Sequence, residues 1–248
     1  MLRPRTLRAI AAAHAAAIRV VIVTGRMFQS ARPYAREAGI DDPIICYQGA
    51  VVADPVTGEF LRHEPIPLAL AREAIAAVQE AGFGLNVYVD DELYVASITP
   101  NAKSYAGFQH IQIHAVGDLL AWLEKPPTKL VSVDDPHALD RLEVEMKARF
   151  DGRLYIAKSL PHFLEFASPG VTKAAGLDFL SEHLGFTPGD TVAFGDGEND
   201  VELLDWAGYA VAVANAHDRV LALADFVCPS VDEEGVAQVI EALLSSRP

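Results

Sequence analysis

The chain has 248 residues, of which 51% are hydrophobic, and this is enough to bury one large core or two moderate ones. Its 34 acidic residues outnumber its 20 basic residues and give a formal net charge of −14, so we expect it to bind neither nucleic acid nor an anionic membrane surface. Two cysteines without metal-ligand spacing argue against a disulfide framework and favour a reducing cytoplasm, and no apolar run reaches the roughly 18 residues of a membrane span.

The N-terminal segment resembles a leader peptide in composition, because three arginines precede the Ala-rich residues 9–17. Leu7, Ile10 and His14 nevertheless recur at the spacing of one helix face, which favours an ordinary core helix. A buried strand is predicted directly afterwards at residues 19–23, so removal of a leader would discard part of a packed unit.

Residues 1–52 alternate between helix and strand, with short apolar runs typical of parallel sheets at 18–23 and 44–46. From residue 64 the pattern becomes antiparallel, and Asp90-Asp91 and Asp134-Asp135 are interpreted as turns. Residues 99–128 are weakly patterned. The other elements expected in this middle third are helices at 68–81 and 136–150 and strands at 84–89, 93–98, 129–133, 154–158 and 163–167.

After Pro169 the alternation of helix and strand returns. The expected helices lie at 172–184, 198–206, 217–223 and 234–244, and the expected strands at 191–194, 209–213 and 226–228. We therefore predict an α/β protein with a Rossmann-like parallel-sheet core formed by residues 1–65 and 167–248. An α+β domain of residues 66–166 interrupts this core.

The strongest chemical signal is the run from Gly195 to Asp200, which places the carboxylates of Asp196, Glu198 and Asp200 and the amide of Asn199 between an apolar strand and a helix. Ligands of open α/β sheets bind beyond the carboxyl ends of the strands, and carboxylate oxygens suit Mg²⁺. An acidic turn that only caps the following helix explains the run equally well when it is taken alone.

Other metal and catalytic signals are weak. A calcium EF-hand loop would need Gly at its sixth position and Glu at its twelfth, where this run has Val201 and Ala207. His110 and His114 have no third zinc ligand nearby in the sequence, and Lys129 is interpreted as an edge or surface lysine. The motifs G-x-S-x-G and H-E-x-x-H and a Gly-rich phosphate loop are absent.

Two further positions suit a phosphate. Thr24 and Gly25 follow the apolar run 20–23, where a hydroxyl and free N–H groups can hold phosphate oxygens, although a simple helix cap by Thr24 is the plainer interpretation in isolation. Lys173 opens a predicted helix, where the helix dipole disfavours a cation, so we expect another anion nearby.

Taken together, Thr24-Gly25-Arg26, Gly49-Ala50, Lys173 and the run from Gly195 to Asp200 resemble motifs two to four of the haloacid dehalogenase superfamily in order and spacing. The closest group looks like the Cof-type phosphatases of subfamily IIB, whose α+β cap is inserted between the second and third motifs. The resemblance covers nearly the whole chain.

The resemblance implies an Mg²⁺-dependent phosphatase that hydrolyses small phosphorylated metabolites, sugar phosphates first among them, through an aspartyl phosphate. The substrate residues that it implies are Thr24, Gly25, Arg26, Gln48, Gly49, Lys173 and Asn199. It further implies catalytic roles for Thr24, Lys173 and Asp200, with Mg²⁺ held by Asp196, Asn199 and Asp200. Asp200 would support the metal or orient Lys173.

The sequence departs from the family pattern at two places. It contains no Asp-x-Asp, the family's first motif, whose first aspartate is the nucleophile, and its first acidic residue is Glu37. The family's strand with this motif lies between the strands that lead to Thr24 and Asp196, so we expect the natural protein to start upstream and the chain as written to form no phosphoenzyme. Gln48 stands where the family usually has Asn, which leaves its substrate contacts open.

A second functional hypothesis is a non-catalytic relative that retains the Mg²⁺ and phosphate ligands and binds a phosphorylated metabolite. Under either hypothesis the partner is a small-molecule phosphate ester, and the expected assembly is a monomer or a homodimer. Substrate selection is expected to lie in the inserted domain, which would close over the site.

Overall fold

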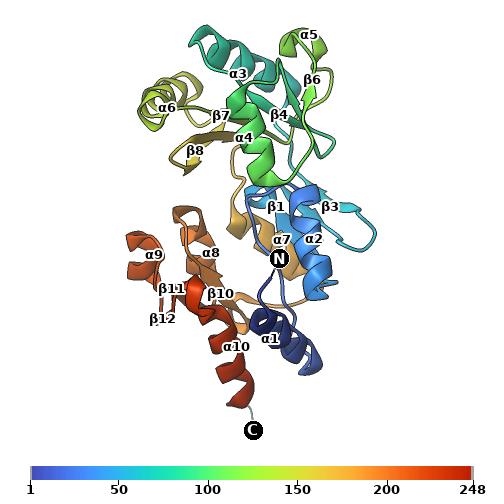
Figure 1. Cartoon of the computed structure of the whole chain (residues 1–248), viewed down its shortest axis with the longest axis vertical. Helices are drawn as coiled ribbons and strands as arrows, with labels where there is room; N and C mark the ends of the chain where they lie inside the picture. The colour runs from blue at the N-terminus through green and yellow to red at the C-terminus, as the bar shows by residue number, and fades with distance from the viewer. Residues whose placement is uncertain (1, 247–248) are drawn as a thin grey trace. The chain divides into compact units, whose positions relative to one another are not determined.

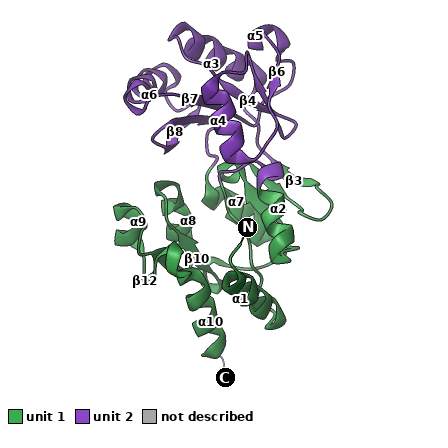
Figure 2. Ribbon diagram, viewed as in Figure 1, with its two compact units in different colours: residues 1–24, 31–62, 172–248 green, residues 25–30, 63–171 purple. Residues whose placement is uncertain are grey.

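The structure is a computed structural model that describes residues 2–246 and divides into two compact units (Figure 2). Unit 1 comprises Met1–Thr24, Ala31–Arg62 and Thr172–Pro248, and unit 2 comprises Gly25–Ser30 and His63–Val171. Within residues 2–246, no helix has the length and apolar composition needed to cross a membrane.

Unit 1 contains two three-stranded sheets. Strands β10 (Val192–Gly195), β11 (Tyr209–Val213) and β12 (Phe226–Cys228) are parallel and adjacent in that order (Figure 1). Strands β1 (Ile44–Cys46), β2 (Val51–Ala53) and β3 (Phe60–His63) form the second sheet, in which β1 and β2 are antiparallel. Continuous apolar residues therefore form the inner strands of both sheets.

The strand predicted at residues 19–23 is not a regular strand in the structure. Val23 forms an isolated parallel bridge with Ile45, and the Thr24 N–H donates to the Ile45 carbonyl at 2.8 Å. Among the described residues no strand pairing joins this segment to β10, so each of the two has a sheet neighbour on one side only. A short segment with one neighbour lacks half of its ladder, which explains the irregular backbone.

The helices of unit 1 surround these sheets. They are α1 (Pro4–Ala15), α2 (Phe28–Ala38, whose first turn counts with unit 2), α7 (Lys173–Leu184), α8 (Val201–Trp206), α9 (Asp218–Leu223) and α10 (Gly235–Ser245). As expected for a core helix, α1 buries Ile10 and packs against α10, where Arg5 pairs with Glu241. Ile45, Leu177 and Leu203 belong to the apolar core beneath α7 and α8.

Unit 2 is built on one six-stranded sheet with the order β6-β5-β4-β7-β9-β8. Its strands are β4 (Asn86–Val89), β5 (Glu92–Val95), β6 (His114–Ala115), β7 (Lys129–Val133), β8 (Tyr155–Leu160) and β9 (Phe163–Ala167). Its helices are α3 (Leu68–Glu80), α4 (Pro100–Gln109), α5 (Leu119–Trp122) and α6 (Pro136–Phe150). The apolar residues of α3, α5 and α6 pack on one face of the sheet.

The expected hairpin forms around Asp90 and Asp91, which both adopt left-handed backbone angles with φ of 52° and 60°. Asp91 also has a longer-range role, because its carboxylate accepts the N–H groups of Phe28 and Gln29 at 3.0 and 2.8 Å. These bonds group residues 25–30 with unit 2, whereas we expected this segment in the α/β part. The weakly patterned region 99–128 contains α4, β6 and α5.

Candidate active site

The centre of the candidate site is a buried ion pair between Lys173 and Asp200, each about 5% exposed. Lys173 is the first residue of α7, and the hydroxyl of Thr172 caps this helix by accepting the Ala175 N–H at 3.0 Å. Asp200 ends the short 3-10 turn that follows β10. The anion that we expected near Lys173 is therefore the Asp200 carboxylate.

The Asp200 carboxylate is also fixed by the backbone. One of its oxygens pairs with Lys173, and the other accepts the N–H groups of Asp196 and Gly197 at 3.0 and 3.1 Å. Both oxygens are thus engaged, one by Lys173 of α7 and the other by the loop after β10. This arrangement favours the orientation of Lys173 over direct metal coordination as the role of Asp200.

Asp196 lies at the surface, directly after β10. Partial desolvation and then the neighbouring negative charge of Asp200 raise the pKa of its carboxyl above the ordinary range, while Lys173 opposes the shift. A bound cation would relieve this repulsion, because it neutralises the two carboxylates together.

The ligand set for Mg²⁺ is partial in residues 2–246, where no three His, Cys, Asp or Glu side chains are grouped to hold a metal ion. Mg²⁺ is commonly held by one or two carboxylates and completed by water and substrate phosphate, so Asp196 fits as one ligand. The side-chain nitrogen of Asn199 donates a hydrogen bond to Gln48 Oε1 at 3.1 Å. The side-chain oxygen of Asn199 is therefore available as a second ligand for Mg²⁺.

The loop that places Gln48 next to Asn199 has a strained backbone. Tyr47, Gln48 and Gly49 follow one another in the left-handed region, with φ of 51°, 59° and 105°, at a cost of about 1–3 kcal/mol for each non-glycine residue. A Cβ atom on Gly49 would lie 1.9 Å from the carbonyl oxygen of Thr172, so only glycine fits against the start of α7. The packing of Gly49 against Thr172, which maintains this strained backbone, therefore also positions Lys173, the next residue along the chain.

Thr24 joins the same network in unit 1. Its carbonyl accepts the Gln48 N–H at 3.2 Å, so Thr24, Gln48 and Asn199 are linked in one chain of hydrogen bonds. The alternative of a helix cap does not fit Thr24, because α2 begins at Phe28 and its first N–H groups donate to Asp91.

Gly25 and Arg26 belong to unit 2. The Gly25 carbonyl accepts a hydrogen bond from Lys129 Nζ at 3.1 Å, and the Arg26 guanidinium lies 5.3 Å from the centre of the Phe108 ring. Arg26 also donates to Ser30 Oγ at 3.0 Å.

Lys129 was wrongly predicted to be an edge or surface lysine. It is 2% exposed, because β7 lies between β4 and β9, and it pairs with Glu165, itself 6% exposed, at 3.2 Å. Burial is the largest single effect on the pKa of Lys129 and lowers it, but the charge of Glu165, the nearby Tyr105 hydroxyl and the hydrogen bond to Glu165 together outweigh burial and leave that pKa raised. The signal in the sequence was one opposite charge within each of two apolar strands, 129–133 and 163–167.

The weaker candidate residues from the sequence, His110 and His114 and the pair Asp134-Asp135, do not form metal or catalytic sites in the described residues. His114 pairs with Glu92 at 3.2 Å, and His110 ends α4 in a left-handed conformation, so no zinc group arises from them. Asp134 and Asp135 connect β7 to α6, and Asp135 caps the first N–H groups of that helix.

Residues 1–240 match the family of haloacid dehalogenase-like hydrolases. The chain belongs to this family. The structure of this haloacid dehalogenase-like hydrolase resembles that of a haloacid dehalogenase-like hydrolase from Bacteroides thetaiotaomicron, with a TM-score of 0.90, 27% identity and coverage of 98% of this chain and 93% of the other. It also resembles a crystal structure from Thermotoga maritima, with a TM-score of 0.86, 30% identity and coverage of 97% and 90%.

Two curated relatives of this haloacid dehalogenase-like hydrolase carry specific names. A phosphoglycolate phosphatase of Archaeoglobus fulgidus is 27% identical over 241 residues, covering 97% of this chain and 90% of the relative. A 5-amino-6-(5-phospho-D-ribitylamino)uracil phosphatase of Bacillus subtilis is 28% identical over 233 residues, covering 91% and 85%. These matches confirm the resemblance to the Cof-type phosphatases that the motifs indicated.

Proposed function

We propose that this protein is a Mg²⁺-dependent phosphatase of small phosphorylated metabolites. The observation that carries the proposal is the buried Lys173, held at the first position of α7 by Asp200. A lysine in this place adds its charge to the N–H groups of a helix N-terminus, and both favour an anion. Phosphoryl transfer depends mainly on positioning and charge neutralisation, which this arrangement supplies.

The other site residues have supporting roles in this proposal. Thr24 and Gly25 bind the phosphoryl oxygens, and Arg26 contacts the substrate. Gln48 and Gly49 shape the loop against α7, and Asn199 is held by Gln48 near the phosphate. When bound at Asp196, Mg²⁺ neutralises charge on the phosphoryl group.

The nucleophile is the part of the mechanism that these 248 residues do not contain, because they include no Asp-x-Asp. We propose that an additional strand carrying this motif pairs between residues 18–23 and β10. Both segments support this placement, since each has a sheet neighbour on one side only among the described residues and Val192 is 37% exposed. Its first aspartate attacks phosphorus, and its second transfers the proton to the leaving group.

The identity of the leaving group is a separate question. The two named relatives act, by their names, on phosphoglycolate and on a ribitylaminouracil phosphate, which share only the phosphate ester. Sugar phosphates, which we expected first, therefore stay one class among several.

The test compares the chain as given with a version extended to the nearest upstream in-frame start, using Mg²⁺-dependent hydrolysis of p-nitrophenyl phosphate. We expect the extended protein to be active and its Lys173→Met variant to be inactive. An extended protein that carries Asp-x-Asp, is folded and hydrolyses nothing would overturn the phosphatase proposal.

A second candidate function is favoured by the same missing motif. A protein with the phosphate and Mg²⁺ residues but no nucleophile would bind a phosphorylated metabolite without turnover. The binding function is supported, and the phosphatase function excluded, if no in-frame Asp-x-Asp precedes Met1 and the folded chain binds phosphate in calorimetry without releasing product from any ester.

A further inference from the structure

Gly25 and Arg26, which the proposed function assigns to the substrate, belong to a segment, residues 25–30, that groups with unit 2. The chain passes from unit 1 to unit 2 at the peptide bond between Thr24 and Gly25, and it returns to unit 1 within α2. The backbone assigned to the phosphate therefore continues into a helix start whose partners lie in unit 2.

The cap of α2 is supplied by Asp91, which lies 63 residues after Phe28 in the sequence. One oxygen of the Asp91 carboxylate accepts the Phe28 N–H at 3.0 Å, and the other accepts the Gln29 N–H at 2.8 Å. The Asp91 carbonyl also accepts the Gln29 side-chain amide at 2.7 Å. The first N–H groups of a helix have no partner within it, so a carboxylate at this position satisfies them and also interacts favourably with the helix dipole.

Asp91 occupies a turn position that usually belongs to glycine. It is the second of the two residues that connect β4 to β5, because Val89 pairs with Glu92 across the hairpin. Asp90 and Asp91 both have positive φ, 52° and 60°, as in the type I′ turn, where glycine is usual at the second position. A buried aspartate in place of this glycine indicates a use for its carboxylate, and the two bonds to α2 are that use.

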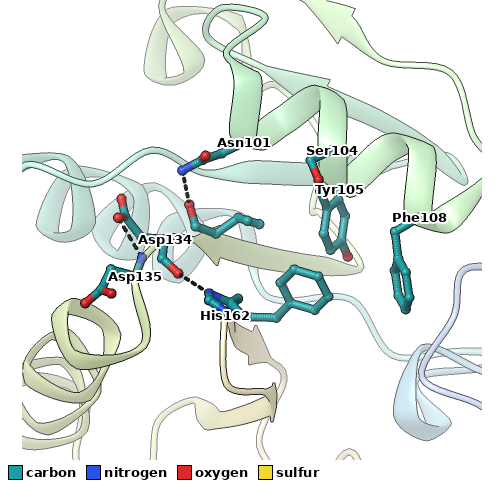
Figure 3. A pocket seen from close by; sticks show the side chains of 9 residues that line it. Asn101, Ser104, Tyr105, Phe108, Asp134, Asp135 and His162 are labelled. Atoms are coloured by element: carbon teal, nitrogen blue, oxygen red, sulfur yellow. Dashed lines mark hydrogen bonds between the residues drawn. The ribbon is translucent and has the colours of Figure 1, made fainter.

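Other contacts also attach residues 25–30 to unit 2. Ser30 Oγ donates to the carbonyl of Gln109, the last residue of α4, at 2.6 Å. The Arg26 guanidinium lies 5.3 Å from the centre of the Phe108 ring, which forms part of the wall of a pocket of about 540 Å³ (Figure 3). The segment is thus held on both sides of the N–H groups that Asp91 caps.

We propose that Asp91 is a positioning residue for phosphate binding, because its cap on α2 orders the Gly25-Arg26 backbone before the phosphate arrives. This inference rests on the proposed function, which assigns that backbone to the substrate. Asp91 occupies the first two N–H groups of α2, so the phosphate contacts fall to the residues before the helix. Without the carboxylate the first turn of α2 opens part of the time, and the apparent affinity falls with the fraction of molecules that are ready to bind.

Asp91→Gly removes the carboxylate and preserves the turn, because glycine adopts positive φ readily and keeps the carbonyl that the Gln29 side chain contacts. Calorimetry with inorganic phosphate should show an affinity about three- to tenfold lower than that of the parent, the range expected from the loss of a typical helix cap. Hydrogen exchange at the Phe28 and Gln29 N–H groups should become faster. A residue that only stabilises the fold would change the melting temperature and leave the phosphate affinity of the folded protein unaltered.

Asp90→Gly is the matched control, because Asp90 has the same conformation in the same turn but pairs with Lys125 at an exposed position. It should leave both the phosphate affinity and the exchange of the Phe28 N–H unchanged. Asp91→Asn should give an intermediate affinity, since Asn tolerates the left-handed conformation and keeps one acceptor oxygen but loses the charge. Asp91→Asn also provides the test if Asp91→Gly does not fold.

The measurements separate this inference from the proposed function. A phosphate affinity equal to that of the parent in the folded Asp91 variants would overturn the role of Asp91 and leave the proposed function standing. Equal weakening in Asp91→Gly and Asp90→Gly would also overturn it, because the turn and not the carboxylate would then be responsible. A folded parent that binds no phosphate would instead count against the proposed function, and the role of Asp91 would fall with it.

Discussion

Among the described residues, each unit contains a buried lysine–carboxylate pair, and these two pairs are held in different ways. In unit 1, Lys173 pairs with Asp200, whose second oxygen accepts two backbone N–H groups. In unit 2, Lys129 pairs with Glu165, and its ammonium group also donates to the Gly25 carbonyl. Backbone N–H groups hold the carboxylate in the first pair, and a backbone carbonyl holds the lysine in the second.

The difference separates a lysine that is available for a ligand from one that is not. Asp200 keeps two hydrogen bonds if Lys173 turns toward a phosphate, so the loop after β10 survives that movement. Lys129 instead lies in an interior strand and lies over the Tyr88 ring at 5.4 Å, where its withdrawal would leave Glu165 with the Ser159 hydroxyl at 2.7 Å. Burial and charge are alike in the two lysines, so they do not by themselves explain why we propose Lys173 and not Lys129 as the phosphate ligand.

The largest effect on stability should follow Lys129→Met, because it leaves the Glu165 charge buried without its partner. We expect a loss of about 3–5 kcal/mol in the free energy of unfolding, measured by urea denaturation. Lys125→Met is the matched control, since Lys125 pairs with Asp90 at an exposed position and its replacement should leave stability nearly unchanged. Equal losses in the two variants would contradict the comparison.

Lys173→Met should cost less stability than Lys129→Met, about 1–3 kcal/mol, because the backbone continues to hold Asp200. Its main effect should be the loss of phosphate binding, measured by calorimetry with inorganic phosphate. Lys129→Met, measured at a temperature where it is folded, should retain that binding. The comparison fails if the two lysine variants weaken phosphate binding alike.

Replacing both members of the pair in unit 2 should recover most of the lost stability. In Lys129→Met/Glu165→Leu no charge stays buried, and such replacements of buried ion pairs are often neutral or stabilising. The corresponding Lys173→Met/Asp200→Leu should not recover, since the N–H groups of Asp196 and Gly197 lose their acceptor. Urea denaturation of the parent and of the single and double variants gives a double-mutant cycle for each of the two ion pairs.

The smallest effect on stability should come from Asp196→Asn. The pKa of Asp196 is raised in the folded protein, so its ionised form opposes folding once the pH rises above the ordinary value of about 3.9, fully so above the raised pKa. The melting temperature of the variant should therefore be slightly higher than that of the parent at pH 7 and equal to it at lower pH. The variant should also bind Mg²⁺ more weakly than the parent. A variant that melts lower than the parent at pH 7 would show that the carboxylate stabilises the loop.

Local patterns in the sequence predicted much of the fold and part of the site. Apolar patterns located α3, α6 and the strands of unit 2 other than β6, and the turn residues Asp90-Asp91 located the hairpin. The place of Lys173 at a helix start correctly indicated an anion, because the helix dipole is a local property of the chain.

Features that depend on distant partners could not be predicted from the sequence. The interior position of β7 follows from the strand order, which one sequence does not contain, so the burial of Lys129 was missed. Residues 25–30 group with unit 2 through Asp91, and the close approach of Gly49 to Thr172 joins two segments that are far apart in the sequence. α4 was missed although its buried residues share one helix face, because the buried Gln109 is polar and the apolar Phe108 is exposed.

The half-paired segment 18–23 also affects how this polypeptide behaves in a test tube. Residues 20–23 are Val-Val-Ile-Val, a β-branched run without charge or proline, and the sheet edge beside them carries N–H and C=O groups that are not paired to β10 among the described residues. Natural edge strands are protected from one another by charges, prolines or bulges, and this run has none of these. At high concentration the chain as given should therefore aggregate through this edge, and a peptide with the sequence of the strand that we propose pairs there should keep it in solution.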